Sequence, residues 1–576
     1  MPKLTPRPLF ALAFAALLTP APVLAQDATK PVTSDAGAYL AARISGSESD
    51  YRAAAGWYAR ALISDPTNPA LLEGAVIANM GLGQFDAAAA IGRQLQQTGV
   101  KSQPAFVALL VDQTKREDYA GILADAAAGR SIGTLVDGLV LAWAELGNGR
   151  MSEAQQAFDK IATSSGLEVF GLYHKALALA AVGDYEGADE ILSGRAKGSV
   201  QLLRRGVIAH AEILSQLERN PDAVAVLDTH FIPGRDAGID ALRTRLVAGE
   251  PIPYDVARTA SEGIAEVFFT LASALNGEAE NGFTLSYARA AAHLRPDHSE
   301  AILLAASLLE ELGQHDLATE TYALIPTTDP TYHIAEIGRS DALYAAGNVE
   351  ASIETLKALT RSNGDRVMVQ MALGDALRRE QRFEEATGAY DAAIELATKA
   401  PSGLDWQLYF SRGICHERQK RWELAQADMR HALELSPDQP AVLNYLGYAY
   451  LELNTNLDEA LSMIQRAAAA RPESGAIVDS LAWGLYRLGR IDEALEPMER
   501  ASQLEPVDPV VTDHLGDVYW AVGRKLEARF QWQRALSFDP EEKDALRIRK
   551  KLDVGLDAVL AEEGAKPLPA KTADGN

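Results

Sequence analysis

The sequence is poor in the residues that form disulfides and zinc sites. Among 576 residues there is a single cysteine, Cys415, so no intrachain disulfide can form. The ten histidines are scattered, and no two have the i, i+4 spacing that places a pair of metal ligands on one helix face. We therefore expect no metal and no cofactor. Because a lone thiol persists best when it is shielded, we expect Cys415 to be buried.

Long apolar runs and strand-forming runs are also missing. After the N-terminus, no segment approaches the roughly 20 apolar residues that a membrane-spanning helix needs. Runs of Val, Ile and Thr are few, whereas Ala and Leu recur with Glu, Arg and Asp between them. These patterns predict an all-α protein with no integral membrane segment beyond its N-terminus.

Positive charge is in deficit, since the formal net charge is -25. Such a field repels polyanions. We therefore expect neither nucleic acid nor an anionic membrane surface as a general partner.

The N-terminus has the layout of a secretory signal. Lys3 and Arg7 lead an apolar stretch from Leu9 to Leu18, followed by prolines and Val23-Leu24-Ala25. We predict a signal peptide over residues 1–25, cleavage before Gln26 and a periplasmic protein. An uncleaved signal that anchors the chain to the inner membrane is the alternative.

The strongest pattern is a period of 34 residues, which separates Pro472, Pro506 and Pro540. Before the last two prolines, small and large apolar residues recur at identical positions: Leu481, Ala482, Leu485, Ala494, Met498 and Ala501, then Leu515, Gly516, Tyr519, Ala528, Trp532 and Ala535. Positions i, i+1 and i+4 share one helix, and i, i+4 and i+7 of a second helix form a facing stripe. Gly489 and Gly523 mark the turns. Each unit is therefore predicted to be a hairpin of two helices.

This unit resembles the tetratricopeptide-repeat family, whose repeat has 34 residues and two antiparallel helices. The resemblance extends upstream in weaker copies, with Arg412 in place of a leading Leu. It implies an all-α fold, a right-handed superhelical solenoid of antiparallel helix pairs with about a dozen repeats. The chain looks like the long exported repeat proteins of bacteria.

The period also divides the chain. The segment 229–262 is rich in Pro and Gly and breaks the register. We predict a linker at 26–36, a degenerate repeat array at 37–228, an irregular boundary at 229–262, a regular array at 263–540, a capping helix at 541–563 and a disordered tail at 564–576.

In the family geometry, the first helix of each repeat lines a concave face. The positions two before, two after and five after the leading Leu would point into it, and in the last three repeats they are Asn444, Tyr448, Leu451, Asp479, Trp483, Tyr486, Asp513, Asp517 and Trp520. Rigid aromatics with short carboxyl and amide groups suit an extended peptide. Aromatics at this spacing also serve as packing between repeats, and that alternative stays open.

No catalytic constellation is evident. Cys415 and His416 are adjacent, so on a helix they point about 100° apart. The motif around Ser131, Gly129 to Gly133, matches a hydrolase elbow by letter, but an alanine-rich helix precedes it where that elbow needs a strand. We therefore expect a non-catalytic scaffold for protein or peptide partners, serving envelope-complex assembly or polysaccharide export by analogy. The alternatives are a regulator or carrier of an envelope hydrolase, or an unrecognised hydrolase.

Overall fold

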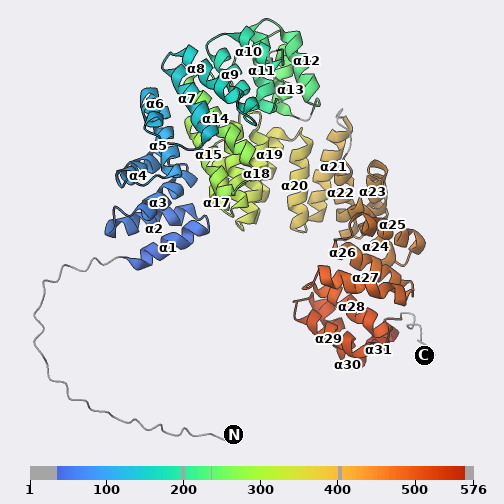
Figure 1. The fold of residues 1–576 in the computed structure, drawn as a ribbon. Helices are drawn as coiled ribbons and strands as arrows, with labels where there is room; N and C mark the ends of the chain where they lie inside the picture. Colours follow the sequence, from blue (N-terminus) through green and yellow to red (C-terminus); the bar gives the residue numbers. More distant parts are fainter. Residues whose placement is uncertain (1–34, 196–201, 235, 400–404, 565–576) are drawn as a thin grey trace, which may run out of the picture. The chain divides into compact units, whose positions relative to one another are not determined.

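The computed structural model describes residues 35–195, 202–234, 236–399 and 405–564, and in these ranges it has helices, turns and loops but no strand (Figure 1). The predicted all-α class is therefore confirmed. The predicted signal peptide 1–25, most of the linker 26–36 and the tail after residue 564 lie outside the described residues.

The described residues form two compact units, unit 1 up to residue 113 with residues 130–132, and unit 2 with residues 114–129 and those from 133 onward. The helices of unit 1 are α1 (Ala36–Ser47), α2 (Tyr51–Ser64), α3 (Pro69–Gly81), α4 (Phe85–Gln97) and α5 (Gln103–Lys115), whose last two residues belong to unit 2. Neighbouring helices pack closely: a Cβ at Gly74 on α3 would lie 2.2 Å from Cζ of Tyr58 on α2. Only glycine fits there.

Unit 2 begins with a series of shorter and less regular helices. They are α6 (Tyr119–Ala127), α7 (Thr134–Gly147), α8 (Met151–Ala162), α9 (Glu168–Ala181), α10 (Tyr185–Leu192), α11 (Arg204–Gln216), α12 (Asn220–His230) and α13 (Ala237–Val247). Each of the helices from α7 to α12 packs on its successor, so the series ends with α13.

A second series follows with longer hairpins. Its helices are α14 (Ala260–Leu275), α15 (Asn281–Leu294), α16 (Ser299–Glu311), α17 (His315–Tyr322), α18 (Tyr332–Ala345), α19 (Val349–Asn363), α20 (Val367–Arg379), α21 (Phe383–Lys399), α22 (Trp406–Arg418), α23 (Trp422–Leu435), α24 (Pro440–Glu452), α25 (Leu457–Ala470), α26 (Gly475–Arg487), α27 (Ile491–Leu504), α28 (Pro509–Ala521) and α29 (Lys525–Leu536). Each helix again packs on its successor. The predicted solenoid of antiparallel helix pairs is therefore confirmed.

The small residue of the repeat works as the period predicts. Gly516 on α28 faces Trp532 on α29, and a Cβ there would lie 2.4 Å from Cδ1 of that ring. Trp532 is completely buried. The turn residues Gly489 and Gly523 have φ of 75° and 88°, the left-handed region that glycine enters without strain.

Arg412, the departure from the repeat pattern, does not shift its helix. It lies on α22 and presents a guanidinium to α23, where Nε and Nη2 donate to the two Asp428 oxygens at 2.8 and 2.6 Å. Nη1 donates to Asp391 on α21 at 2.6 Å. A two-pronged ion pair thus takes the place of the usual apolar contact.

The second series does not stack on the end of the first. After α13 and an extended loop, α14 returns to pack on α7 and also contacts α9 (Figure 1). Gly263 on α14 meets Trp143 on α7 so closely that a Cβ would be 2.3 Å from the indole. Trp143 is completely buried and its Nε1 donates to Nδ1 of His174 on α9 at 3.2 Å. A junction of α7, α9, α11 and α14 therefore joins the two series.

Two predicted segments differ in detail from the structure. The range 229–262, predicted to be irregular, contains all of α13 between two loops, and α14 already begins at Ala260. The single capping helix predicted at 541–563 is two helices, α30 (Glu542–Val554) and α31 (Leu556–Glu562). Gly555 breaks them with φ of 85°. Side-chain charge does not reveal this break, which the backbone of one glycine produces.

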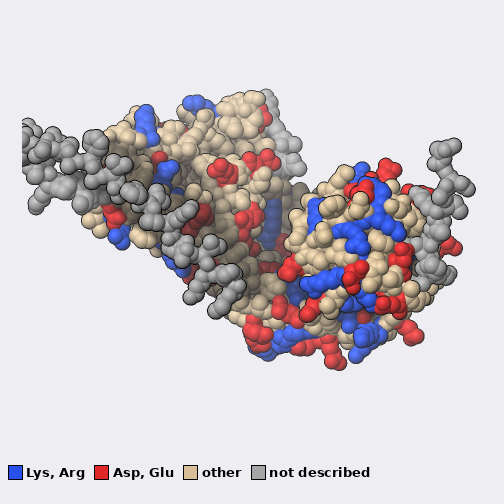
Figure 2. All heavy atoms as spheres, turned by 90° about the horizontal axis from the view of Figure 1, so that it is seen from below, with Lys and Arg blue, Asp and Glu red and all other residues tan. Residues whose placement is uncertain are grey.

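Acidic and basic side chains lie intermingled on the face drawn in Figure 2. Among the described residues, no helix is long and apolar enough to cross a membrane.

Candidate functional site

The nine predicted groove residues lie on α24, α26 and α28, the first helices of the last three repeats. Asn444 and Tyr448 are half-buried. The other seven are buried: Leu451, Asp479, Trp483, Tyr486, Asp513, Asp517 and Trp520. Most of their surface is therefore taken up by contacts inside the protein, and their role in partner binding remains a prediction.

The aromatic residues form a stack between α26 and α28. The Trp483 ring lies 3.8 Å from the His514 ring, with 9° between their planes, and 4.8 Å from the Tyr486 ring. Nδ1 of His514 contacts the two Asp479 oxygens at 3.0 and 3.1 Å. Burial alone would lower the pKa of His514, but Asp479 outweighs it and raises that pKa. Asp479 therefore favours the protonated form of His514, which lies between a carboxylate and an aromatic face.

The carboxylates of α28 are bound by a lysine of α30. Lys551 on α30 is completely buried, and its Nζ donates to Asp513 at 2.9 and 2.7 Å and to Asp517 at 2.6 and 2.7 Å. Trp532 Nε1 also donates to Asp517 at 2.9 Å. Trp520 Nε1 donates to Asp557 on α31 at 3.0 Å. The C-terminal helices thus occupy the polar groups that sequence reasoning assigned to a partner.

Two polar atoms of this face keep unused hydrogen-bonding capacity. Within the described ranges, Oδ1 of Asn444 and the hydroxyl of Tyr486 are buried without a hydrogen-bond partner. Burial raises the pKa of the Tyr486 hydroxyl, so it stays protonated.

A cleft of about 350 Å³ opens upstream, between the first helices α18 and α20 of consecutive hairpins. Met368 and Met371 line it from α20, and Ile337 lines it from α18. Arg379 crosses between the helices, with Nη2 donating to Asp341 at 3.0 Å and its guanidinium 4.4 Å from the Tyr344 ring. The cleft thus combines adaptable thioether side chains with a charged edge.

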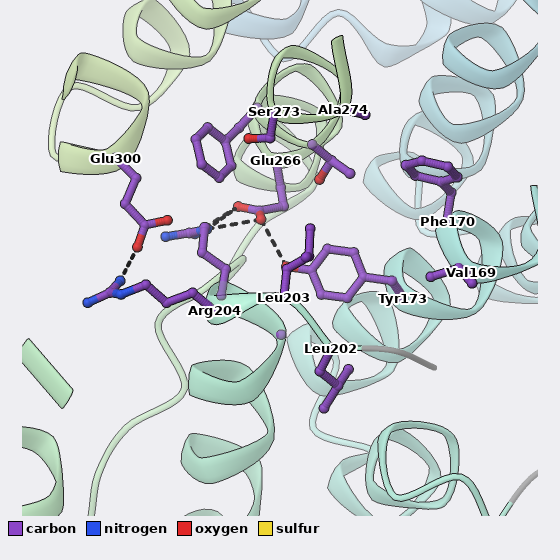
Figure 3. Close-up of a pocket in the computed structure, with 14 residues that line it drawn as sticks. Val169, Phe170, Tyr173, Leu202, Leu203, Arg204, Glu266, Ser273, Ala274 and Glu300 are labelled. Atoms are coloured by element: carbon purple, nitrogen blue, oxygen red, sulfur yellow. Dashed lines mark hydrogen bonds and ion pairs between the residues drawn. The ribbon is translucent and has the colours of Figure 1, made fainter. Parts of the chain in front are cut away.

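A cavity of about 570 Å³ lies at the junction. Its walls come from α9, α11 and α14, with Glu300 added from α16 (Figure 3). Most of the lining is apolar: Val169, Phe170, Leu202, Leu203, Phe269 and Ala274. It therefore has the size and character of a small-molecule pocket.

A buried polar network lies against this cavity. The Tyr173 hydroxyl donates to Glu266 at 2.9 Å, and Arg205 Nε donates to both Glu266 oxygens at 2.9 Å. Nη2 of Arg205 adds an ion pair at 2.7 Å. Burial alone would raise the pKa of Glu266, but Arg205 and then His298 hold it well below its ordinary value. Glu266 is therefore ionised and fully paired although it is only 1% exposed.

Sequence reasoning missed the junction cavity because its walls come from three separated segments that the repeat period does not link. One signal was present: Glu266 interrupts an apolar stretch, Ile264 to Phe269, where an isolated acid needs a buried partner. The adjacent Arg204 and Arg205 were available for that purpose, but sequence alone gave no reason to pair them with α14.

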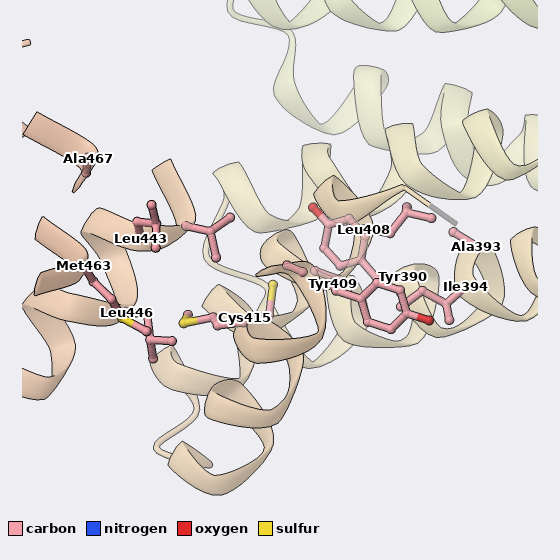
Figure 4. Packing of buried hydrophobic residues seen from close by; sticks show 14 of the residues in the cluster. Tyr390, Ala393, Ile394, Leu408, Tyr409, Cys415, Leu443, Leu446, Met463 and Ala467 are labelled. Atoms are coloured by element: carbon pink, nitrogen blue, oxygen red, sulfur yellow. The ribbon is translucent and has the colours of Figure 1, made fainter. Parts of the chain in front are cut away.

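The predicted burial of Cys415 is confirmed. Its side chain packs with Tyr390, Leu408 and Leu446 inside the core of the regular hairpins (Figure 4). Burial raises the pKa of the thiol to about 11, so it is protonated at neutral pH. A buried, protonated thiol is a poor nucleophile.

The segment around Ser131 lacks the framework of a hydrolase elbow. A helix, α6, precedes it, and Gly129 has φ of 76° with its N–H donating to Ala126 at 3.0 Å, as in a helix C-cap. Over the described ranges, no group of three or more His, Cys, Asp or Glu residues is arranged to hold a metal ion.

Comparison with known proteins agrees with the hairpin architecture. The sequence model of the tetratricopeptide repeat matches residues 337–403 and 410–475. The first match contains α19, α20 and α21, and the second contains α23, α24, α25 and α22 from residue 410 onward. A repeat-containing protein of the same kind from Pseudomonas aeruginosa is 26% identical over 186 residues. That alignment covers 32% of this chain and only 30% of the relative.

Solved structures with similar folds were also found. The Cut9 and Hcn1 hetero-tetramer structure of the APC/C has 13% identity and a TM-score of 0.38, covering 91% of this chain and 97% of that one. Yeast Tom70 has 12% identity and a TM-score of 0.35, with 92% and 99% covered. YrrB, described as a repeat protein with an unusual peptide-binding site, has 20% identity and a TM-score of 0.27, with 34% and 99% covered.

Proposed function

This chain is a tetratricopeptide-repeat protein, and from that premise we propose that it is a non-catalytic scaffold that binds extended segments of partner proteins. Its repeats support protein binding in general. The finer statement, where on the chain a partner segment binds, rests on the geometry of the first helices.

The cleft between α18 and α20 is the observation that carries this proposal. It lies between consecutive first helices, and its lining residues are within the stretch 337–403 that matches the family. Met368 is 46% exposed there, although a large apolar side chain gains free energy by leaving water. A partner side chain that entered the cleft would cover it.

The charged edge of the cleft sets the polarity of the partner. Asp341 is bound by Arg379, while Asp375 accepts a hydrogen bond from the Tyr390 hydroxyl at 2.7 Å. With the whole chain at -25, electrostatic steering favours a basic over an acidic segment. We therefore expect an apolar anchor residue next to Lys or Arg.

Peptides selected from a display library against the purified chain test this proposal. Met368→Glu should weaken the selected peptides by about tenfold or more, because about 1.4 kcal/mol corresponds to a factor of ten. Leu424→Glu is the matched control, because Leu424 is 50% exposed on α23. This helix is the second of its hairpin and does not line the cleft. Equal affinity in both variants would reject the cleft as the binding site.

The cellular role that we propose is assembly of an envelope complex or polysaccharide export, in the periplasm. The segment of residues 1–25 supports export. A chain recovered from cells should begin at Gln26. Recovery of an intact N-terminus in the membrane fraction would instead support the anchored form.

The competing proposal is a regulator or carrier of an envelope hydrolase, or a hydrolase itself. Turnover of peptidoglycan or a model ester by the purified chain, abolished in Ser131→Ala, would favour the hydrolase and contradict the scaffold. Turnover only when a hydrolase is added, with a rate that depends on this chain, would favour the regulator.

A further inference from the structure

We propose that the junction cavity is a second binding site, separate from the repeat cleft, for an uncharged molecule with a single hydrocarbon chain and a small polar head. This inference is independent of peptide binding by the repeats. Four features of the cavity support it: its size, its open apolar mouth, its neutralised charges and its few free polar groups.

The size suits a hydrocarbon chain. Figure 3 shows Glu300 on one side of the lining, Glu266 and Tyr173 in its middle, and Val169 and Phe170 on the other side. The volume of about 570 Å³ lies within the roughly 300–1,000 Å³ typical of sites that enclose small ligands.

The mouth is apolar and exposed. Leu203, the residue before α11, is 69% exposed, and Val169 on α9 is 43% exposed. Apolar surface in contact with water costs about 25 cal/mol per Å², so covering this mouth and the walls behind it would drive binding of a hydrocarbon.

The charges of the cavity are already paired. Arg205 is held by Glu266, and Arg204 donates to Asp236 at 2.7 Å and to Glu300. Two guanidinium groups thus face three carboxylates, so an anionic head would have to displace a carboxylate from an existing ion pair. This favours an uncharged ligand over a fatty acid anion.

The free polar groups are too few for a peptide. A peptide backbone carries one N–H and one C=O per residue, and each needs a partner when buried. Among the side chains that line the cavity in the described ranges, the hydroxyls of Thr270 and Ser273 take no part in the ion-pair network around Glu266 and Arg204. They lie nearly one turn apart on α14, where they can bond one hydroxyl or ester oxygen.

Displacement of the neutral dye Nile red from the purified full chain tests the proposal. Dodecanol should displace the dye at one site, and dodecanoate should need a concentration about tenfold higher. Peptides selected for the repeat cleft should leave the dye in place. Failure of dodecanol to displace the dye would overturn the proposal. Tighter binding of dodecanoate than of dodecanol would overturn the assignment of an uncharged head. Displacement of the dye by the peptides would show that the cavity binds peptides.

A pair of variants locates the site. Ala274→Trp places an indole at the exposed edge of the cavity and should weaken dodecanol by about tenfold. Ala427→Trp makes the same change at an exposed alanine on α23 and should not alter binding. Circular dichroism and melting verify that both variants fold. Equal dodecanol affinity in the two folded variants would reject this cavity as the binding site. Because Met368→Glu does not alter the cavity, the cavity proposal and the cleft proposal are tested independently.

Thr270→Val with Ser273→Ala sharpens the assignment of the polar head. The double variant keeps the apolar walls and removes both hydroxyls, so dodecanol should weaken several-fold while Nile red binds as before. Unchanged dodecanol affinity would show that α14 does not bind the head.

Discussion

The regular hairpins α20 to α29 and the junction of α7, α9, α11 and α14 hold helices together in different ways. In the hairpins, a small residue faces a large apolar one at a repeated position, as Gly516 faces Trp532. In the junction, ionised and titratable groups are buried: Glu266 is 1% exposed and His174 is completely buried. The first arrangement repeats along the sequence, whereas the Glu266 network joins segments that the repeat period does not link.

The difference bears on how each region tolerates change. An apolar contact between repeats loses free energy in proportion to the atoms removed, and its neighbours are unaffected. A buried polar network depends on every member, because removal of one partner leaves another unpaired in a site without water. We therefore expect single substitutions to have larger effects in the junction.

The largest expected effect is from Glu266→Ala, which leaves Arg205 buried without its carboxylate. We expect about 3–5 kcal/mol of lost local stability. Hydrogen exchange of α9, α11 and α14 measures it region by region, which suits a long repeat chain that does not unfold in one step. Glu278→Ala is the control, because Glu278 is exposed after α14. Comparable exchange in both variants would show that the network does not hold the junction.

Next in size is an opposite pH response of the two regions. Burial lowers the pKa of His174 to about 4. The contribution of this histidine to folding stability is therefore complete above its unfolded pKa of about 6.5, and up to about 3 kcal/mol of stability is lost as the pH falls toward 4. The raised pKa of His514 has the reverse sign: its contribution is complete below about 6.5 and is lost as pH rises through the raised value.

Hydrogen exchange at several pH values separates the two effects. Between pH 6.5 and 4, α7 and α9 should lose protection, and His174→Gln should reduce that loss. Above pH 6.5, α26 and α28 should lose protection instead. A response of the same sign in both regions would contradict the assignment of one neutral and one charged histidine.

A smaller effect is expected from a methyl group added between regular hairpins. Gly516→Ala would place a Cβ 2.4 Å from the Trp532 ring and should cost about 1–3 kcal/mol. Gly388→Ala on α21 is the matched change with nothing within 4 Å, and it should stabilise by up to about 1 kcal/mol. Thermal melting of both variants gives the comparison. A change in melting temperature of the same sign in both would refute the close packing at Gly516.

The smallest expected effect concerns Cys415. Because the thiol is completely buried with a raised pKa, a soluble thiol reagent should label it only as fast as the surrounding hairpins open. The labelling rate should rise with denaturant. Rapid labelling of the native chain would show that the thiol is accessible.

The hairpin fold could be predicted from the sequence because the residues that make the contacts recur at fixed positions in each repeat. Leu515, Gly516 and Tyr519 lie on one helix and Ala528, Trp532 and Ala535 on the next, so the period alone pairs the helices. Even the weaker copies upstream follow this rule, because α7 packs on α8 and α9 packs on α10. Local patterns suffice wherever the contacts are between neighbours.

The docking of α14 could not be predicted in the same way. Trp143 and Gly263 are 120 residues apart, and no repeated spacing connects them. The groove residues illustrate a related limit: their positions on α26 and α28 followed from the repeat, whereas the pairing of Asp513 and Asp517 with Lys551 depended on the path of the C-terminal helices. Long-range contacts of single residues leave no periodic signal.

The junction is tested most directly by a double-mutant cycle between α7 and α14. Gly263→Ala should cost about 1–3 kcal/mol in the native background, because its Cβ would lie 2.3 Å from the Trp143 indole. In the Trp143→Leu background the smaller side chain leaves room, so the same change should cost close to nothing. An equal cost in both backgrounds would contradict the contact, and with it the conclusion that the second series of hairpins begins on α7 and α9.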